Sequence, residues 1–162
     1  MHEVGKQQRR SWLLACAGMA VAVAAPVVRA ADAVLPTPKS LPDELVKALR
    51  IGQPLVVMVS LAGCPFCRVA RNNYLEPLRR EEGVPVVQID MRSAVQVLDF
   101  KRMVTTHDQL VREWGVKVAP SVLFFGSAGQ EVAERLQGAY IEDFYGAYLD
   151  QRLQQARATL KA

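Results

Sequence analysis

The sequence predicts an α/β domain with a mixed β-sheet that is covered by helices on both faces. Apolar, β-branched runs typical of buried strands alternate with amphipathic stretches typical of helices. After the third apolar run, a glycine-containing turn leads directly into another strand-like segment, which predicts a closing antiparallel hairpin. The 162 residues are enough for one domain with a hydrophobic core. We therefore expect about four strands, and those joined through helices should pair in parallel.

The first half of the domain is predicted to be helix, strand, helix, strand. Ser40 should cap a helix that ends at Leu49 or Arg50. Residues 54–61 (PLVVMVSL) form an unbroken apolar run, typical of a strand buried on both faces. A second helix should follow to about Glu82, with a kink at Pro77 because proline lacks the backbone donor. The second strand is expected over residues 84–90.

The second half should contain helix, strand, strand, helix. Residues 91–105 are expected to form an irregular excursion with a helical turn. Thr106 and Gln109 have the spacing of a capping box, which predicts a helix ending at Trp114. His107, in the first turn of that helix, is interpreted as a solvated residue. The remaining elements are strands over 121–125 and 131–138, a turn over 126–129, and a long helix over about 141–160.

Residues 1–30 are interpreted as a cleavable export signal. Lys6, Arg9 and Arg10 precede an apolar stretch, and the small-residue spacing of Val28-Arg29-Ala30 predicts cleavage after Ala30. The alternative is a permanent transmembrane helix, which Pro26 and Arg29 would interrupt. Residues 31–40 then form a linker, residues 41–162 form the domain, and the protein is expected in the periplasm.

The export route stays open. The paired arginines before Ser11 and Trp12 resemble a twin-arginine motif, but an ordinary secretory signal can also contain such a pair. Leu13 to Cys16 resembles a lipoprotein box, although only five residues separate Arg10 from Cys16. A lipid anchor at Cys16 is therefore a minor alternative.

The charge of the exported domain is close to balanced. Residues 1–30 hold four of the 20 basic side chains and one of the 16 acidic ones, which leaves 16 basic and 15 acidic, a net charge of +1. The high pI of the whole chain thus comes mostly from the signal. Nothing in this balance favours a nucleic-acid partner.

The cysteines point to chemistry rather than to structural cross-linking. Of the three cysteines, Cys16 leaves with the signal, and Cys64 and Cys67 form a Cys-x-x-Cys pair. A disulfide across so short a ring stabilises a fold little. The same spacing is half of a zinc site, but the exported domain has no third cysteine and one histidine, His107. Metal binding is the less favoured alternative, and no metal or other cofactor is expected.

The position of the pair predicts different roles for the two thiols. Cys64 lies where a buried strand ends and a helix begins, and Pro65 suits the first helical position. Backbone N–H groups at a helix start favour a thiolate, which is the nucleophile in disulfide exchange. Cys67 lies nearly one turn further in. Cys64 is therefore predicted to attack, and Cys67 to resolve the mixed disulfide.

Two separated motifs give the chain a family resemblance. The strand–CPFC–helix unit and the segment WGVKVAPSVLFFGSAGQEVAERLQGAY (residues 114–140) resemble the thioredoxin superfamily, over about residues 41–160. The resemblance implies that Pro120 is cis and precedes the third strand. It also implies that Ala119, Pro120 and Gly138 contact the substrate. The whole pattern is most similar to exported thioredoxin-like proteins of the SoxW type, which are taken to be thiol reductants.

The chain departs from thioredoxin at several positions. Met58 occupies the place of the buried carboxylate that accepts the proton of the second cysteine, and Val86 is expected in place of the nearby lysine. No side-chain base can be named for Cys67. Phe66 replaces the histidine that stabilises the thiolate in strong periplasmic oxidases.

These residues favour a disulfide reductase over an oxidase or isomerase, although the direction of electron flow stays open. The expected partners are protein thiols and disulfides and a membrane electron-transfer protein, with the domain itself a monomer.

Overall fold

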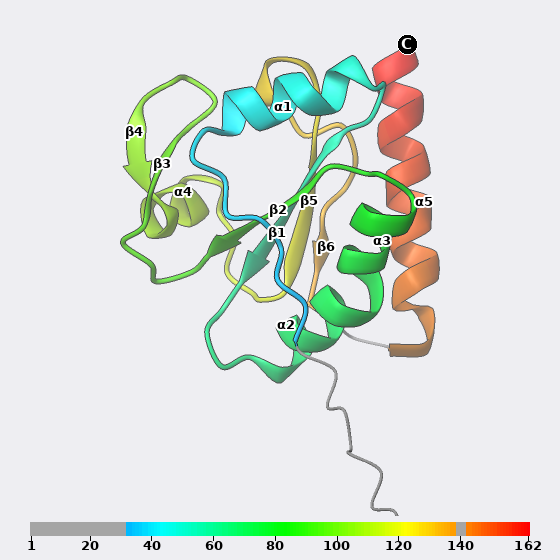
Figure 1. Cartoon of the computed structure of the whole chain (residues 1–162), viewed down its shortest axis with the longest axis horizontal. Coiled ribbons are helices and arrows are strands. Elements are labelled where there is room, and N and C mark those ends of the chain that lie inside the picture. Colours follow the sequence, from blue (N-terminus) through cyan, green and yellow to red (C-terminus); the bar gives the residue numbers. More distant parts are fainter. Residues whose placement is uncertain (1–31, 139–141) are drawn as a thin grey trace, which may run out of the picture. The chain divides into compact units, whose positions relative to one another are not determined.

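The computed structural model describes residues 32–138 and 142–162 and shows a central sheet between two layers of helices (Figure 1). The sheet has the strand order β2-β1-β5-β6. Its strands are β1 (Leu55–Ser60), β2 (Val86–Asp90), β5 (Ser121–Phe125) and β6 (Leu136–Gln137). All six residues of β1 are buried, as the unbroken apolar run predicted. The predicted export signal lies outside the described residues.

The sheet is mixed, as expected, but one pairing differs from the prediction. β1 and β2 are parallel, with Met58 opposite Gln88. The third strand, β5, was expected to run parallel because a helix precedes it, yet it lies antiparallel to β1, with Val59 opposite Ser121. The helix before β5, α4 (His107–Glu113), has seven residues and spans only about 10 Å, so it does not by itself carry the chain back along the sheet. The chain enters β5 at the end of the sheet where it left β2.

Helices cover both faces of the sheet because side chains of successive strand residues point to opposite faces. One face packs against α1 (Leu41–Arg50) and α4. The other packs against α2 (Pro65–Ala70), α3 (Glu76–Glu81) and α5 (Glu142–Lys161), and it includes Met58 and Cys67. Among the described residues, no helix combines the length and the apolar character that a membrane span requires.

The long second helix is interrupted near Pro77, as its sequence predicted. A π-helical turn (Arg71–Leu75) separates α2 from α3, and the Glu76 N–H reaches back to the Arg71 carbonyl. Pro77 has no N–H to donate to the carbonyl of Asn73, and its ring would crowd that carbonyl in a regular helix. The wider turn just before Pro77 relieves this conflict and sets the path of Arg71.

The prediction for residues 91–105 was wrong, because this segment forms a β-hairpin rather than a helical turn. β3 (Gln96–Leu98) pairs antiparallel with β4 (Val104–Thr106). The turn is held by Asp99, whose carboxylate accepts the N–H groups of Lys101 at 2.9 Å and Met103 at 2.7 Å. Local side-chain hydrogen bonds thus set the hairpin.

The closing hairpin is shorter than predicted. Only Leu136 and Gln137 form a ladder with β5, and Glu131 makes an isolated bridge to Phe125. The pairing shifts register between these contacts. Arg135 takes part in the interruption by donating to the Trp114 carbonyl at 2.7 Å and pairing with Glu131. The turn before it is a short 3₁₀ segment, η2 (Ser127–Gly129).

Candidate active site

Cys64 and Cys67 lie at the start of α2, directly after the end of β1. Gly63 lies in the turn between β1 and Cys64 and has a φ of +75°, a backbone conformation that glycine adopts without strain. Cys64 is the N-cap of α2 and Pro65 is its first residue. The Cys67 N–H donates to the Cys64 Sγ at 3.2 Å, and both thiols are free. The helix start therefore provides a backbone donor to the first sulfur, as the sequence predicted.

The two thiols differ in their surroundings. Cys64 is partly exposed, whereas Cys67 is 1% exposed. Burial raises the pKa of Cys67 to about 11, and hydrogen bonding to Cys64 contributes to the rise. A backbone hydrogen bond from Leu61 and a side-chain hydrogen bond from Ser60 act in the opposite direction. The second thiol is thus mainly protonated at neutral pH, but its sulfur has two neighbouring donors.

The residues implied by the resemblance lie beside Cys64. The Ala119–Pro120 peptide is cis and directly precedes β5. The Cys64 thiol lies 3.9 Å from the Ala119 carbonyl oxygen, to which it donates. The Gly138 N–H donates to the Pro120 carbonyl at 2.7 Å. The structure therefore places Ala119 next to the first sulfur and joins the two loops by a backbone hydrogen bond between Gly138 and Pro120.

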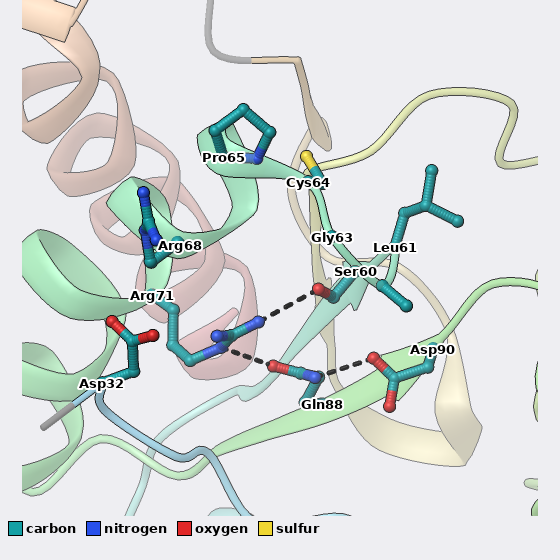
Figure 2. A pocket seen from close by; sticks show the side chains of 11 residues that line it. Asp32, Ser60, Leu61, Gly63, Cys64, Pro65, Arg68, Arg71, Gln88 and Asp90 are labelled. Carbon is teal, nitrogen blue, oxygen red and sulfur yellow. Dashed lines mark hydrogen bonds between the residues drawn. The ribbon is translucent and has the colours of Figure 1, made fainter.

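A pocket of about 390 Å³ opens next to Cys64 (Figure 2). A chain of hydrogen bonds crosses its wall. Arg71 donates from Nε to Gln88 Oε1 at 2.8 Å and from a terminal nitrogen to Ser60 Oγ at 3.2 Å, and Gln88 Nε2 donates to Asp90 Oδ1 at 2.7 Å. The exposed Arg68 also lines the pocket. Sequence reasoning missed this network, because its members come from β1, the π turn and β2.

The register of β1 with β2 shows which residues lie next to Met58. Val86, expected in place of the family's lysine, pairs with Val56, and Gln88 is the partner of Met58. Val86 and Gln88 are two residues apart, so their side chains point to the same face of the sheet. The polar side chain nearest in register to Met58 is therefore an amide that belongs to the pocket network.

The expectation for His107 was wrong, because this residue is 0% exposed rather than solvated. Its Nδ1 accepts the Asp90 N–H at 3.2 Å, and Nε2 has no hydrogen-bond partner among the described residues. Burial lowers the pKa of His107, although Asp90 opposes the shift. The spacing of His107, Leu110 and Val111, which are all buried, is the i, i+3, i+4 pattern of an inward helix face. This spacing in the sequence indicates that His107 lies on the buried face of the helix.

The described residues do not contain a group of three or more His, Cys, Asp or Glu side chains arranged to hold a metal ion. What residues 32–138 and 142–162 do contain is a dithiol beside a cis proline at the end of a buried strand. Fold and site together define an α/β protein with a paired-thiol centre. Residues 41–153 match the family model described as a thioredoxin-like domain, and the chain belongs to this family.

The chain is similar to several solved thioredoxins, each at low sequence identity. Thioredoxin O2 from Arabidopsis thaliana is 18% identical, with 73% of this chain and 93% of that chain covered, at a TM-score of 0.50. Fasciola hepatica thioredoxin is 19% identical, with 75% of this chain and 99% of that chain covered, at a TM-score of 0.49. The periplasmic thioredoxin SoxS from Paracoccus pantotrophus is 20% identical, with 64% of this chain and 99% of that chain covered, at a TM-score of 0.43. No curated protein matches the chain.

Proposed function

We propose that the protein is a periplasmic thiol–disulfide oxidoreductase that reduces disulfides in other proteins. The observation that carries the proposal is the asymmetry of the dithiol. Cys64 caps a helix at the rim of a pocket, and Cys67 is buried with its N–H bonded to the Cys64 sulfur. A surface nucleophile paired with an enclosed second thiol is the arrangement that disulfide exchange requires.

The reaction follows in two balanced steps. The Cys64 thiolate attacks one sulfur of the substrate disulfide, and the other substrate sulfur leaves as a thiolate and takes a proton. Cys67 then loses its proton and attacks the Cys64 sulfur, which releases the second substrate thiolate. Two electrons pass to the substrate, and the Cys64–Cys67 disulfide is formed. Ala119, which the Cys64 thiol contacts, and Pro120 and Gly138, which are joined by a backbone hydrogen bond, are proposed to contact the substrate chain.

Reduction is the proposed direction for reasons of side-chain chemistry. Phe66, which stands between the cysteines and is 54% exposed, cannot donate a hydrogen bond to a thiolate as a histidine could. Residues 1–30 have the pattern of an export signal, and the overall pattern resembles the SoxW type. An exported reductase needs electrons from across the membrane, so a membrane electron-transfer protein is the proposed donor.

Replacement of the two cysteines tests the mechanism. We expect Cys64→Ser to abolish reduction of the insulin disulfides, because the attacking sulfur is missing. Cys67→Ser should instead accumulate mixed disulfides that non-reducing electrophoresis detects as a slower band. The absence of trapped species in Cys67→Ser would contradict the assigned roles.

Equilibration of the Cys64–Cys67 couple with glutathione buffers tests the direction. A potential close to that of thioredoxin, roughly −270 mV, supports a reductase. A potential close to that of the strong periplasmic oxidases, roughly −120 mV, reverses the proposed direction of electron flow.

A further inference from the structure

Ser60 connects the pocket network to the buried thiol. It is the last residue of β1, it is 1% exposed, and its side chain lies on the sheet face that packs against α2. Its hydroxyl oxygen accepts a hydrogen bond from Arg71 at 3.2 Å. A buried hydroxyl with one bond accepted still has a hydrogen to donate, and the direction of that donation decides its chemical effect.

The hydrogen bonds that begin at Asp90 determine which way the Ser60 hydroxyl can donate. The Asp90 carboxylate can only accept, so Gln88 presents its NH₂ group to Asp90 and its carbonyl oxygen to Arg71 (Figure 2). A guanidinium can only donate, so its bond to Ser60 must end on the hydroxyl oxygen. The hydroxyl hydrogen is consequently free to point away from Arg71.

Cys67 is 1% exposed and belongs to the cluster that contains Met58, on the face of the sheet to which the Ser60 side chain also points. Hydrogen bonding from the Ser60 side chain and from the Leu61 backbone lowers the pKa of Cys67, against the larger effect of burial. Ser60 and Leu61 are thus the two donors that favour a thiolate at this buried sulfur. They offset part of the cost of placing a negative charge where solvent is excluded.

We propose that Ser60 stabilises the Cys67 thiolate by a hydrogen bond during resolution of the mixed disulfide, and that Arg71 is the positioning residue that orients the Ser60 hydroxyl. The proposal rests on the thiol–disulfide exchange proposed above and supplies that reaction with a means of activating its second thiol. No carboxylate is required at the position of Met58.

The step balances without a further reactant. Cys67 gives its proton to water in the adjoining pocket, and its thiolate attacks the Cys64 sulfur. The bond between Cys64 and the substrate sulfur breaks, the electron pair leaves on the substrate sulfur, and that sulfur takes a proton from water. The Ser60 hydroxyl keeps its own proton throughout.

Other ionisable groups around Cys67 contribute differently. Cys64, on the same helix, disfavours the Cys67 thiolate by its charge and its hydrogen bond. Tyr145, on α5, stays neutral because burial raises its pKa. Arg71 and Asp90 act at a distance, through the ends of the network. The hydroxyl of Ser60 is therefore the side-chain donor whose removal is most informative.

Exchange with dithiobis(nitrobenzoic acid), followed by stopped flow in the reduced protein, separates the two steps. Attack by Cys64 releases one coloured thiolate at a rate proportional to the reagent, and attack by Cys67 releases the second at a rate independent of it. We expect Ser60→Ala to slow the second phase about tenfold or more at neutral pH, since a hydrogen bond to a charged group is lost. The pH at which the second phase reaches half of its maximal rate should rise. The rate of the first phase should stay within about twofold of that in the unaltered protein.

Three further variants complete the test. Ser60→Thr keeps the hydroxyl and should restore the second phase. Arg71→Met should slow it in the same sense as Ser60→Ala. Arg79→Met is the matched control, because Arg79 lies on the next helical segment in its own pair with Glu76, and it should leave both phases unchanged.

An unchanged second phase in Ser60→Ala, or an equal slowing of both phases, overturns the proposal, as does a Ser60→Thr variant as slow as Ser60→Ala. If Ser60→Ala does not fold, an unchanged second phase in Arg71→Met overturns it. Failure of the unaltered protein to release any coloured thiolate would instead contradict the proposed function.

Discussion

The two cysteines are three positions apart in sequence, but they meet different surroundings. Cys64 faces the pocket and the Ala119 carbonyl, whereas Cys67 packs in the core with Ala70 and Tyr145. Access to a sulfur and the cost of ionising it both limit its reaction with an external reagent. The structure therefore predicts that the thiols react with small alkylating agents in a fixed order.

Alkylation of the reduced protein with iodoacetamide tests this order. We expect Cys64 to be labelled first and Cys67 to resist labelling until the pH approaches its pKa of about 11. Fragment-ion mass spectrometry of the peptide that contains both cysteines locates the label. Equal labelling of the two positions at neutral pH would show that Cys67 is not enclosed as the structure describes.

How much of the site can be predicted depends on where its residues lie in the sequence. Cys64 and Cys67 form a local motif, and Pro120 belongs to a second motif, so the sequence indicates them directly. Arg71, Ser60 and Gln88 are ordinary residues in three separate elements. The register of β1 with β2 and the position of the π-helical turn over these strands bring them together. A network of this kind has no signature along the chain.

At the scale of elements, η2 packs closely against the turn of the β3–β4 hairpin. Gly129 has a φ of +70°, and a Cβ at this position would lie 2.3 Å from the Phe100 ring. Phe100 in turn stacks on Trp114 and contacts Phe125, with ring centroids 6.3 and 4.7 Å away. Glycine is therefore required both for the backbone conformation and for the approach of the aromatic ring.

Two glycine substitutions separate these requirements. Gly129→Ala should lower the free energy of unfolding by about 2–4 kcal/mol, because it combines backbone strain with overpacking against Phe100. Gly83→Ala is the matched control, since Gly83 has a φ of +69° but no atom within 4 Å of the added Cβ. It should cost only about 1 kcal/mol. Urea denaturation measures the free energy of unfolding of both variants. Equal losses in the two variants would contradict the close approach of Phe100 to Gly129.

The elements differ in how well their sequences predict them. β1 and β5 are continuous apolar runs, and α4 has a capping box, so burial and local hydrogen bonds agree in each of them. β3 and β4 have three residues each, which is too short for a clear alternating pattern, and Val104 in β4 is 66% exposed although it is apolar. The antiparallel direction of β5 depends on the path of the chain between the strands, which no local pattern determines.

At the scale of the whole molecule, two buried groups should limit stability at opposite ends of the pH range. The pKa of His107 lies below its ordinary 6.5, so the unfolded chain binds more protons and stability falls as the pH drops below about 6.5. The pKa of Cys67 lies above its ordinary 9.0, so the folded protein binds more protons and stability falls as the pH rises from 9.0 to about 11. Between these limits the two contributions are constant.

Urea denaturation of the reduced protein at a series of pH values measures this profile. We expect His107→Gln to flatten the acid limb and Cys67→Ala to flatten the alkaline limb, each without altering the other. A profile in His107→Gln as steep below pH 6.5 as that of the unaltered protein would show that His107 is protonated in the fold.

The positions of Met58 and of the pocket residues bear on how such a domain changes during evolution. From Leu55 to Val59 the central strand is apolar and buried, so the layer beneath the cysteines contributes packing and carries no buried charge. The polar groups around the thiols lie instead in the wall of an open pocket, at Arg71, Gln88 and Asp90. Exchanges at these wall positions change the environment of the sulfurs without replacing an apolar residue of the central strand. The reactivity of the thiols can therefore vary in evolution while the apolar residues of β1 are kept.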